Sequence, residues 1–215
     1  MKARLLLRVL LVPLLGLLLA GCATTPYDYT NYRAHPPRSI LVLPPLNEST
    51  AVDASYSYLS TVSFPLAEAG YYVFPVAEVD HFLKENGMPT PGEMHQIPLD
   101  KARDILGADA VLYLTIKQYG TKYVVVSSVT TVTVSGKLVD TRTGLTLWEG
   151  TGTAQDNSGG SGNIIADLIS AALTQVINSS VDHAHAVCRL TNVQLFTLKD
   201  HGLLDGPYHP KESDK

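Results

Sequence analysis

The chain has 215 residues, of which 45% are hydrophobic and 17% charged, so it can bury a core and is not intrinsically disordered. With 16 glycines and 13 prolines it is neither collagen-like nor a low-complexity chain. The net charge is −4, and the first 21 residues contribute three positive charges and no negative one, so the remainder carries −7. This balance argues against nucleic acid or an anionic membrane surface as a partner held by charge.

Residues 1–21 have the pattern of a secretory signal peptide. Three basic residues, the last of them Arg8, precede an apolar run over 9–19, and small residues follow. A transmembrane helix needs about 20 apolar residues. The run here is shorter and contains Pro13, so a cleaved signal is favoured over the alternative, an uncleaved membrane anchor.

The signal ends in Leu19-Ala20-Gly21-Cys22, which resembles the bacterial lipobox. In that motif the cysteine is acylated, palmitate included, and becomes the mature N-terminus, so Cys22 is the predicted lipidation site. Two or more acyl chains anchor a protein stably, because each buried methylene contributes about 0.8 kcal/mol. Ala23 follows in place of the aspartate that favours inner-membrane retention in the enterobacterial sorting pattern. The resemblance therefore implies a lipid anchor in the outer membrane, with the domain on the periplasmic face.

The mature chain is predicted to begin with a lipidated N-terminus and tether over 22–38, without helical or strand periodicity. Its 16 residues beyond the cysteine span at most about 50–58 Å when fully extended. Tyr27, Tyr29 and Tyr32 lie in this stretch. They could lie at the lipid interface, dock on a partner, or belong to a solvated linker.

An α/β domain is predicted over 39–190. Strands are expected at 40–43, 71–76 and 110–119, and helices at 52–69, at 77–85 and from Pro98 to Gly107, the first of them bent or interrupted near Pro65. Single helices between strands favour right-handed crossovers and parallel strand pairing.

The pattern changes in the second half of the domain. Residues 123–140 are rich in β-branched side chains, and a change of parity predicts a bulge or bend near Thr130-Thr131. A turn at 140–144 should return the chain antiparallel over 145–154. A long amphipathic helix is expected over 163–188. The predicted fold class is therefore α/β, a two-layer or three-layer βαβ unit with a mixed sheet, an antiparallel C-terminal hairpin and a long helix, followed by a C-terminal tail over 191–215.

The candidates for chemistry are weak. The Gly/Ser loop 158–162 precedes a helix, as phosphate-binding loops do, but it lacks the P-loop and dinucleotide spacings, which favours a flexible connector. Asp182, His183, His185 and Cys188 have the composition of a metal site, but two histidines two residues apart point to different faces of a helix. Cys188 is expected to be a small buried hydrophobe rather than a reactive thiol or an intermolecular bridge. No catalytic, cofactor or metal site is predicted.

Several motifs together resemble one family. They are the lipobox, Gly70-Tyr71-Tyr72-Val73-Phe74-Pro75-Val76, Gly107-Ala108-Asp109-Ala110-Val111-Leu112-Tyr113, Asp140-Thr141-Arg142-Thr143-Gly144, Leu147-Trp148, Gly202-Leu203-Leu204 and Gly206-Pro207-Tyr208-His209-Pro210. The pattern looks like a family of uncharacterised Gram-negative lipoproteins, similar in fold to the TolB amino-terminal domain and to CsgG-like secretion lipoproteins. The resemblance implies CsgG-like lipoprotein partners in an envelope assembly, and no catalytic residues come with it.

The predicted function is that of a non-enzymatic, lipid-anchored periplasmic protein that binds other envelope lipoproteins. The alternative is a ligand-binding accessory lipoprotein of an ABC-type transport system, with a pocket near the loop 86–98. The third hypothesis is an enzyme, such as a hydrolase. The free edge expected for the hairpin 123–154 favours a homodimer, against the alternative of a monomer whose helix 163–188 is fully covered by its own sheet.

Overall fold

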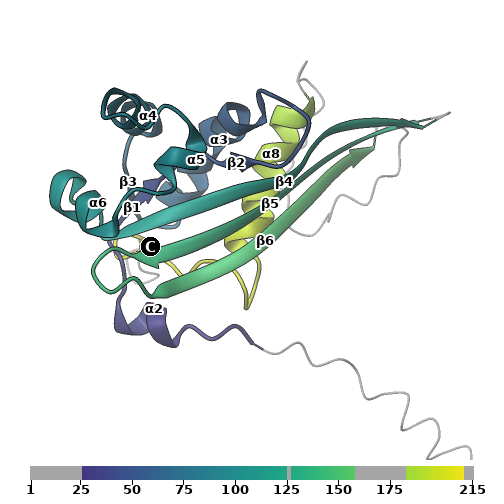
Figure 1. Ribbon diagram of the computed structural model, residues 1–215. Helices are drawn as coiled ribbons and strands as arrows, with labels where there is room; N and C mark the ends of the chain where they lie inside the picture. Colours follow the sequence, from purple (N-terminus) through teal and green to yellow (C-terminus); the bar gives the residue numbers. More distant parts are fainter. Residues whose placement is uncertain (1–25, 125–126, 158–182, 211–215) are drawn as a thin grey trace, which may run out of the picture.

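A computed structural model describes residues 26–124, 127–157 and 183–210 (Figure 1). Its centre is a six-stranded mixed sheet with the strand order β3-β1-β4-β5-β6, in which β2 pairs with β4. The strands are β1 (Ser39–Val42), β2 (Leu46–Asn47), β3 (Tyr72–Val73), β4 (Ala110–Val124), β5 (Ser127–Asp140) and β6 (Thr146–Asn157). The helices are α2 (Thr30–Ala34), α3 (Ala54–Glu68), α4 (Val76–Glu85), α5 (Pro91–Met94), α6 (Leu99–Leu106) and α8 (His183–Thr197).

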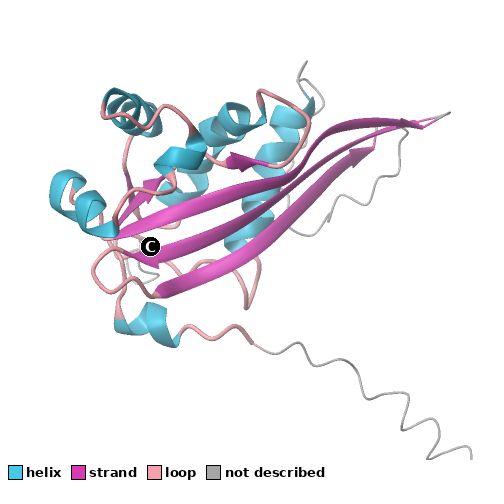
Figure 2. Cartoon of the chain, viewed as in Figure 1, coloured by secondary structure: helices cyan, strands magenta, loops and turns pink. Residues whose placement is uncertain are grey.

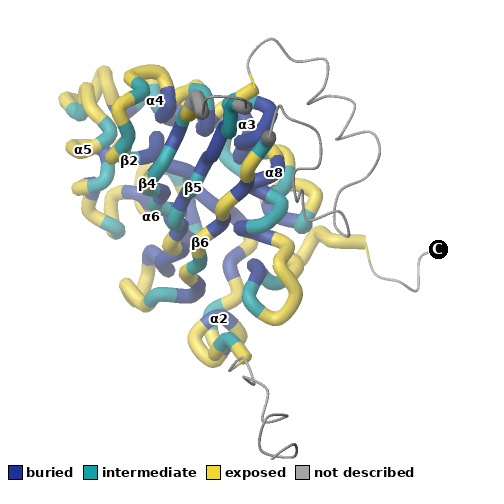
Figure 3. The backbone as a smooth tube through the Cα atoms, turned by 90° about the vertical axis from the view of Figure 1, so that its right-hand side faces the viewer, coloured by how far each residue is buried: buried dark blue, intermediate teal, exposed yellow. Residues whose placement is uncertain are grey.

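Helices lie on both faces of the first strands of the sheet (Figure 2). In β1, Ile40 and Val42 belong to the core formed with α3 and α8. Leu41, together with Leu43 just after the strand, belongs to a second core formed with α4, α5 and α6. Figure 3 shows buried residues, in dark blue, along β4 and β5. A strand buried on both faces explains the uninterrupted apolar run of β1.

Further along the sheet only one face is covered by a helix. α8 packs on β5 and β6, and Val134, Leu138 and Trp148 are buried beneath it. The opposite face of these strands carries polar side chains, with Thr133 and Thr153 hydrogen-bonded to each other at 3.1 Å. The domain therefore has three layers at β1 and two at β5 and β6.

The predicted α/β class and mixed sheet are confirmed. β1 pairs in parallel with β3 and with β4, and β5 pairs antiparallel with β6. The expected helix stop at Gly107 is also confirmed, because this glycine ends α6 with a φ of 76°. α3 continues through Pro65 to Glu68 instead of being interrupted there.

Of the bulge or bend predicted near Thr130-Thr131, the bulge is absent. β5 pairs with both neighbours without a register shift there, and the shifts lie between Ile116 and Gln118 in β4 and between Leu138 and Val139 in β5. The parity change has another cause. Thr130 is buried on the strand, and its hydroxyl is hydrogen-bonded to that of Thr121 on β4 at 2.8 Å. A cross-strand pair of hydroxyl groups thus stands where an apolar side chain was expected.

The strand expected at 110–119 is longer than predicted, because β4 continues to Val124 and forms a long hairpin with β5 that extends past α8 (Figure 1). Residues 123–140 are therefore the end of one strand and the whole of the next. Of the helix predicted over 163–188, residues 163–182 lie outside the described residues, and the remainder belongs to α8.

The ends of the domain also differ from the prediction. α8 continues to Thr197 with Leu195 and Phe196 buried, beyond residue 190, where the sequence predicts a tail. At the other end, Tyr29 and Tyr32 are buried on the domain, and α2 forms within the stretch expected to be a tether. Each of these two segments contributes only a few side chains to the core. Neither therefore has the long periodic pattern of apolar residues by which a helix is recognised in a sequence.

Candidate functional site

Four tyrosines fasten the N-terminal segment to the domain, and we call Tyr27, Tyr29, Tyr32 and Tyr71 the tyrosine clasp. The Tyr32 hydroxyl is hydrogen-bonded to that of Tyr71, which donates to the carbonyl of Leu204. The Tyr29 hydroxyl donates to the carbonyl of Gly202, and the backbone N–H of Glu149 on β6 donates to the Tyr27 hydroxyl at 2.8 Å.

Burial raises the pKa of both Tyr32 and Tyr71, so these phenols stay neutral and keep their hydrogen bonds at physiological pH. The clasp therefore joins the segment after Cys22 to an edge strand and to the loop that follows α8.

The loop after α8 is held against the end of α3 through two glycines. The Gly206 N–H donates to the Ala69 carbonyl at 2.6 Å, and the Tyr208 N–H donates to the Gly70 carbonyl at 3.0 Å. Gly70 has a φ of 85°, and a Cβ there would overlap the backbone of His209. Only glycine combines this positive φ with the absence of a Cβ.

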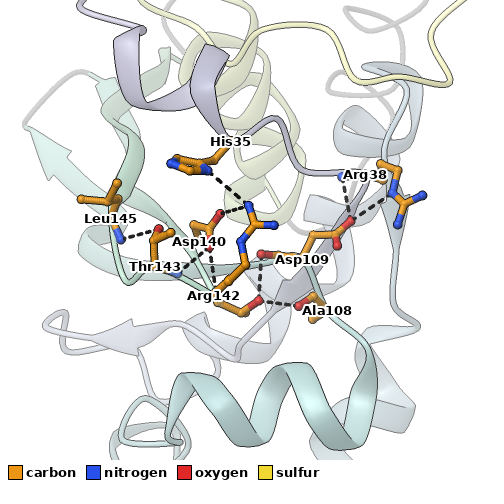
Figure 4. A network of polar contacts seen from close by, with 9 residues as sticks. His35, Arg38, Ala108, Asp109, Asp140, Arg142, Thr143 and Leu145 are labelled. Atoms are coloured by element: carbon orange, nitrogen blue, oxygen red, sulfur yellow. Dashed lines mark hydrogen bonds and ion pairs between the residues drawn. The ribbon is translucent and has the colours of Figure 1, made fainter.

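A second polar network lies where β4 begins (Figure 4). The Asp109 carboxylate accepts hydrogen bonds from the backbone N–H of Arg38 at 3.0 Å and of Ser39 at 3.2 Å. The Thr141 hydroxyl lies 2.7 Å from the Ala108 carbonyl and 2.9 Å from that of Asp109.

The turn between β5 and β6 completes this network. The Asp140 carboxylate accepts from the backbone N–H of Arg142 at 2.7 Å and of Thr143 at 2.8 Å, which closes the turn. Arg142 reaches the His35 ring at 3.2 Å. The carboxylates are thus engaged in backbone hydrogen bonds, and the network holds the turn and the strand start rather than presenting a reactive group.

The motifs that carry the family resemblance meet in these two networks. The motif around Asp109 contacts the motif that begins at Asp140. The motif that begins at Gly70 contacts the motif that begins at Gly206. The Trp148 indole N–H, from a third motif, donates to the His201 carbonyl at 2.9 Å. These residues therefore fix distant segments of the chain to one another.

A cavity of about 870 Å³ lies between α3, α8, α2 and the loop after α8, and we call it the α3–α8 groove. Its apolar lining includes Phe64, Phe196, Leu198 and Leu203. Phe64 is 72% exposed, which is unusual for so large an apolar side chain.

The charged side chains of the groove are Arg33, Arg189, Glu68, Asp200 and Asp205. Within the described part of the chain, neither guanidinium group makes a hydrogen bond or an ion pair, although Arg33 contributes to lowering the pKa of the Asp28 carboxyl group. Asp205 lies 3.9 Å from the His209 ring. Apolar surface and charges of both signs therefore converge on one cavity.

Asn192 on α8 also lines the groove and is 1% exposed. Its Nδ2 donates to the Thr61 hydroxyl at 2.9 Å, and that hydroxyl donates to the Tyr58 carbonyl at 2.8 Å, which fixes the orientation of the amide. Its Oδ1 is buried without a hydrogen-bond partner among the described residues. A buried orphan acceptor is destabilising, by roughly 1–3 kcal/mol.

The large cavity does not lie near the loop 86–98, where a pocket was expected. The cavity that Met88 and Ile97 line has a volume of only about 140 Å³. His95 in this loop is packed against Tyr113, and its Nε2 donates to the Pro44 carbonyl at 2.9 Å. The loop is thus packed against its neighbours, and no local sequence pattern indicates a groove between α3 and α8.

The candidate metal residues do not converge. His183 lies 3.4 Å from the Asp156 carboxylate, His185 contacts the Ser57 hydroxyl at 3.2 Å, and Cys188 is buried, as predicted. Over residues 26–124, 127–157 and 183–210 no group of three or more His, Cys, Asp or Glu side chains is placed to hold a metal ion.

Several predictions concern parts of the chain outside the described residues. These are the signal peptide 1–21, the lipidation site Cys22, the loop 158–162 and Asp182. In the part that is described, no helix is long and apolar enough to cross a membrane.

Comparison with known proteins gives the family. The model of the GNA1162-like lipoproteins matches residues 27–208. A lipoprotein of Neisseria meningitidis serogroup B, NMB1124/NMB1162, is 40% identical over 191 residues, which cover 88% of this chain and 89% of that protein. The crystal structure of lipoprotein GNA1162 from Neisseria meningitidis superposes with a TM-score of 0.57 at 44% identity, over 66% of this chain and 100% of that one. This chain therefore belongs to the GNA1162-like family of lipoproteins.

Proposed function

We propose that this protein is a non-enzymatic envelope lipoprotein that is anchored through acyl chains on Cys22 and binds other envelope proteins from the periplasmic face of the outer membrane. Membership of a lipoprotein family is the observation that carries the proposal, together with the lipobox that ends in Cys22. Partner lipoproteins of the CsgG-like type are part of it. The TolB-like and CsgG-like fold resemblance stays a prediction.

The side-chain chemistry of the described domain supports a binding role. The carboxylates of the network in Figure 4 accept backbone hydrogen bonds, and the clasp hydroxyls are hydrogen-bonded to backbone groups or to each other. The α3–α8 groove has an apolar lining with a few polar groups, as binding sites have.

The anchor is tested by fractionation of a Cys22→Ser variant. This variant should leave the membrane fraction or accumulate as an unprocessed precursor, because serine cannot carry the thioether-linked lipid. Ala23→Ser, a neighbouring substitution that keeps the cysteine, is the control and should fractionate like wild type. A Cys22→Ser protein that migrates and fractionates like wild type would show that the lipobox prediction is wrong.

Partner binding is tested by crosslinking in intact cells, followed by pull-down from membranes solubilised in several mild detergents. We expect the same envelope proteins to co-purify with the full chain in repeated experiments. Recovery of the protein only as a free monomer in every detergent would contradict the proposal.

The volume of the groove also favours a second candidate function, a ligand-binding accessory of a transport system. About 870 Å³ lies within the range of small-molecule sites, roughly 300–1,000 Å³. A thermal-shift screen with small polar metabolites separates the two functions. A metabolite that raises the unfolding temperature of wild type, but not of an Arg189→Gln variant, would favour this second function.

A further inference from the structure

We propose that the α3–α8 groove binds a zwitterionic phospholipid from the same bilayer that holds the anchor. This inference rests on the proposed acylation of Cys22. It assigns to the groove a ligand with an apolar chain, a phosphate and an ammonium group.

The apolar part of the ligand is matched by the lining of the groove. Phe196 and Leu203 are buried, and Phe64 and Leu198 remain 72% and 42% exposed at the surface. An acyl chain lying across these two side chains would remove apolar surface from water, which favours binding in proportion to the area buried.

The headgroup is matched by the charges. The guanidinium groups of Arg33 and Arg189 have no hydrogen bond or ion pair with described residues, and a guanidinium group binds phosphate with two parallel hydrogen bonds. Glu68 and Asp205 line the same cavity and can accept from an ammonium group. A simple anion would meet repulsion from these carboxylates, whereas a zwitterion satisfies both signs.

The position of the groove places it near the membrane. Tyr29 and Arg33, on the N-terminal segment, form part of its lining, and Tyr27 is held on β6 by the Glu149 N–H. From Cys22 to Tyr27 the chain can span only about 17–18 Å. An anchor at Cys22 would therefore keep this end of the domain within one short segment of the lipid headgroups.

The test uses the full processed protein in vesicles of phosphatidylethanolamine and phosphatidylglycerol. A trace of phosphatidylethanolamine carries a photoreactive diazirine in its acyl chain, and a phosphatidylglycerol probe with the same chain is used in parallel. After irradiation, mass spectrometry of the peptides should place the label within 60–69 or 189–205. Labelling by the zwitterionic probe should exceed labelling by the anionic probe several-fold.

The variants make the test specific. Arg33→Gln combined with Arg189→Gln should lower the labelling by the phosphatidylethanolamine probe about tenfold or more, because two charge-assisted contacts are lost. Lys101→Gln combined with Arg103→Gln removes the same charge from α6, and this control should label like wild type. Thermal unfolding of each variant checks that the domain is intact, and the comparison of the two probes on wild type needs no variant.

The outcomes that overturn the proposal are distinct. They are equal labelling by the two probes, labelling unchanged by the double arginine variant, label outside the groove, and crosslinks from the groove to a protein in place of lipid. If Cys22→Ser leaves the membrane while groove labelling of wild type is absent, the lipid site is wrong and the anchor stands. If Cys22→Ser stays in the membrane like wild type, the anchor itself is wrong.

Discussion

Gly152 on β6 lies where α8 comes closest to the sheet. A Cβ at this position would lie 2.7 Å from the Thr191 carbonyl oxygen and 2.9 Å from the Leu195 backbone nitrogen. Both are backbone atoms of the helix, so the helix would have to move. We expect Gly152→Ala to lower the free energy of unfolding by about 1–3 kcal/mol, measured by urea denaturation. Gly92→Ala in α5 is the control and should be neutral or slightly stabilising, because only the Thr90 hydroxyl, at 3.9 Å, is near.

His95 gives a residue-level prediction about pH. Burial lowers the pKa of its imidazole below the usual 6.5, so the unfolded chain takes up a proton there before the folded protein does. Stability should therefore fall as the pH drops below about 6.5, until the folded pKa is passed. His95→Gln keeps a donor for the Pro44 carbonyl but does not titrate. The stability of wild type relative to His95→Gln should therefore fall between pH 7 and pH 5, because at this position only wild type takes up a proton on unfolding. A difference in denaturation midpoint that is the same at pH 7 and pH 5 would contradict the prediction.

Asn192 links stability to binding at the same scale. Asn192→Leu removes the orphan Oδ1, and the Thr61 hydroxyl keeps its bond to the Tyr58 carbonyl. We expect the free energy of unfolding to stay equal or to rise by about 1 kcal/mol. If the Asn192 amide contributes to binding, the variant should bind less ligand in the groove than wild type does. A large loss of stability would instead give Asn192 a structural role.

At the scale of elements, the clasp holds the edge strand β6 through one hydroxyl. Tyr27→Phe keeps the ring, which lies 4.7 Å from that of Tyr29 between centroids, but removes the acceptor for the Glu149 N–H. Hydrogen exchange at the Glu149 amide should become faster, and stability should fall by about 0.5–1.5 kcal/mol. The Thr153 amide, held by Gln194 at 3.1 Å on the same strand, serves as the internal control. Unchanged exchange at Glu149 would show that the clasp does not protect this edge.

The elements also show what the sequence could and could not predict. The apolar run of β1, buried on both faces, and the turn that begins at Asp140 have local sequence signals, and the structure confirms both. The clasp could not be predicted, because Tyr32 meets Tyr71 across 39 residues and Tyr29 meets Gly202 across 173. The groove was missed for the same reason. The side chains that line it come from separate elements, and in the sequence of each element they resemble those of an ordinary exposed helix surface.

At the scale of the whole molecule, the outer edge of the sheet bears on self-association. The sequence predicts a free edge for the hairpin 123–154, but the outward amides of Glu149 and Thr153 donate to Tyr27 and Gln194 side chains. A second copy that paired with β6 would have to displace both. The homodimer itself stays a prediction, with the monomer as its alternative.

We therefore expect Tyr27→Phe combined with Gln194→Ala to self-associate more strongly than wild type. Light scattering of the full chain in a mild detergent, over a range of concentrations, measures the mass. Lys101→Gln combined with Arg103→Gln serves again as a surface control and should leave the mass unchanged. A mass equal to that of wild type at every concentration would show that these side chains do not guard the edge.

The clasp also determines how the domain would carry a mechanical load. The Tyr27 N–H donates to the Asp200 carbonyl at 3.4 Å, so the segment that leads to the anchor and the segment that follows α8 lie side by side. A pull on the anchor would first strain the bonds of Tyr27, Tyr29 and Tyr32, and the paired strands behind them would be loaded only afterwards. Under tension the N-terminal segment would peel away stepwise and lengthen the tether, while the sheet stayed folded.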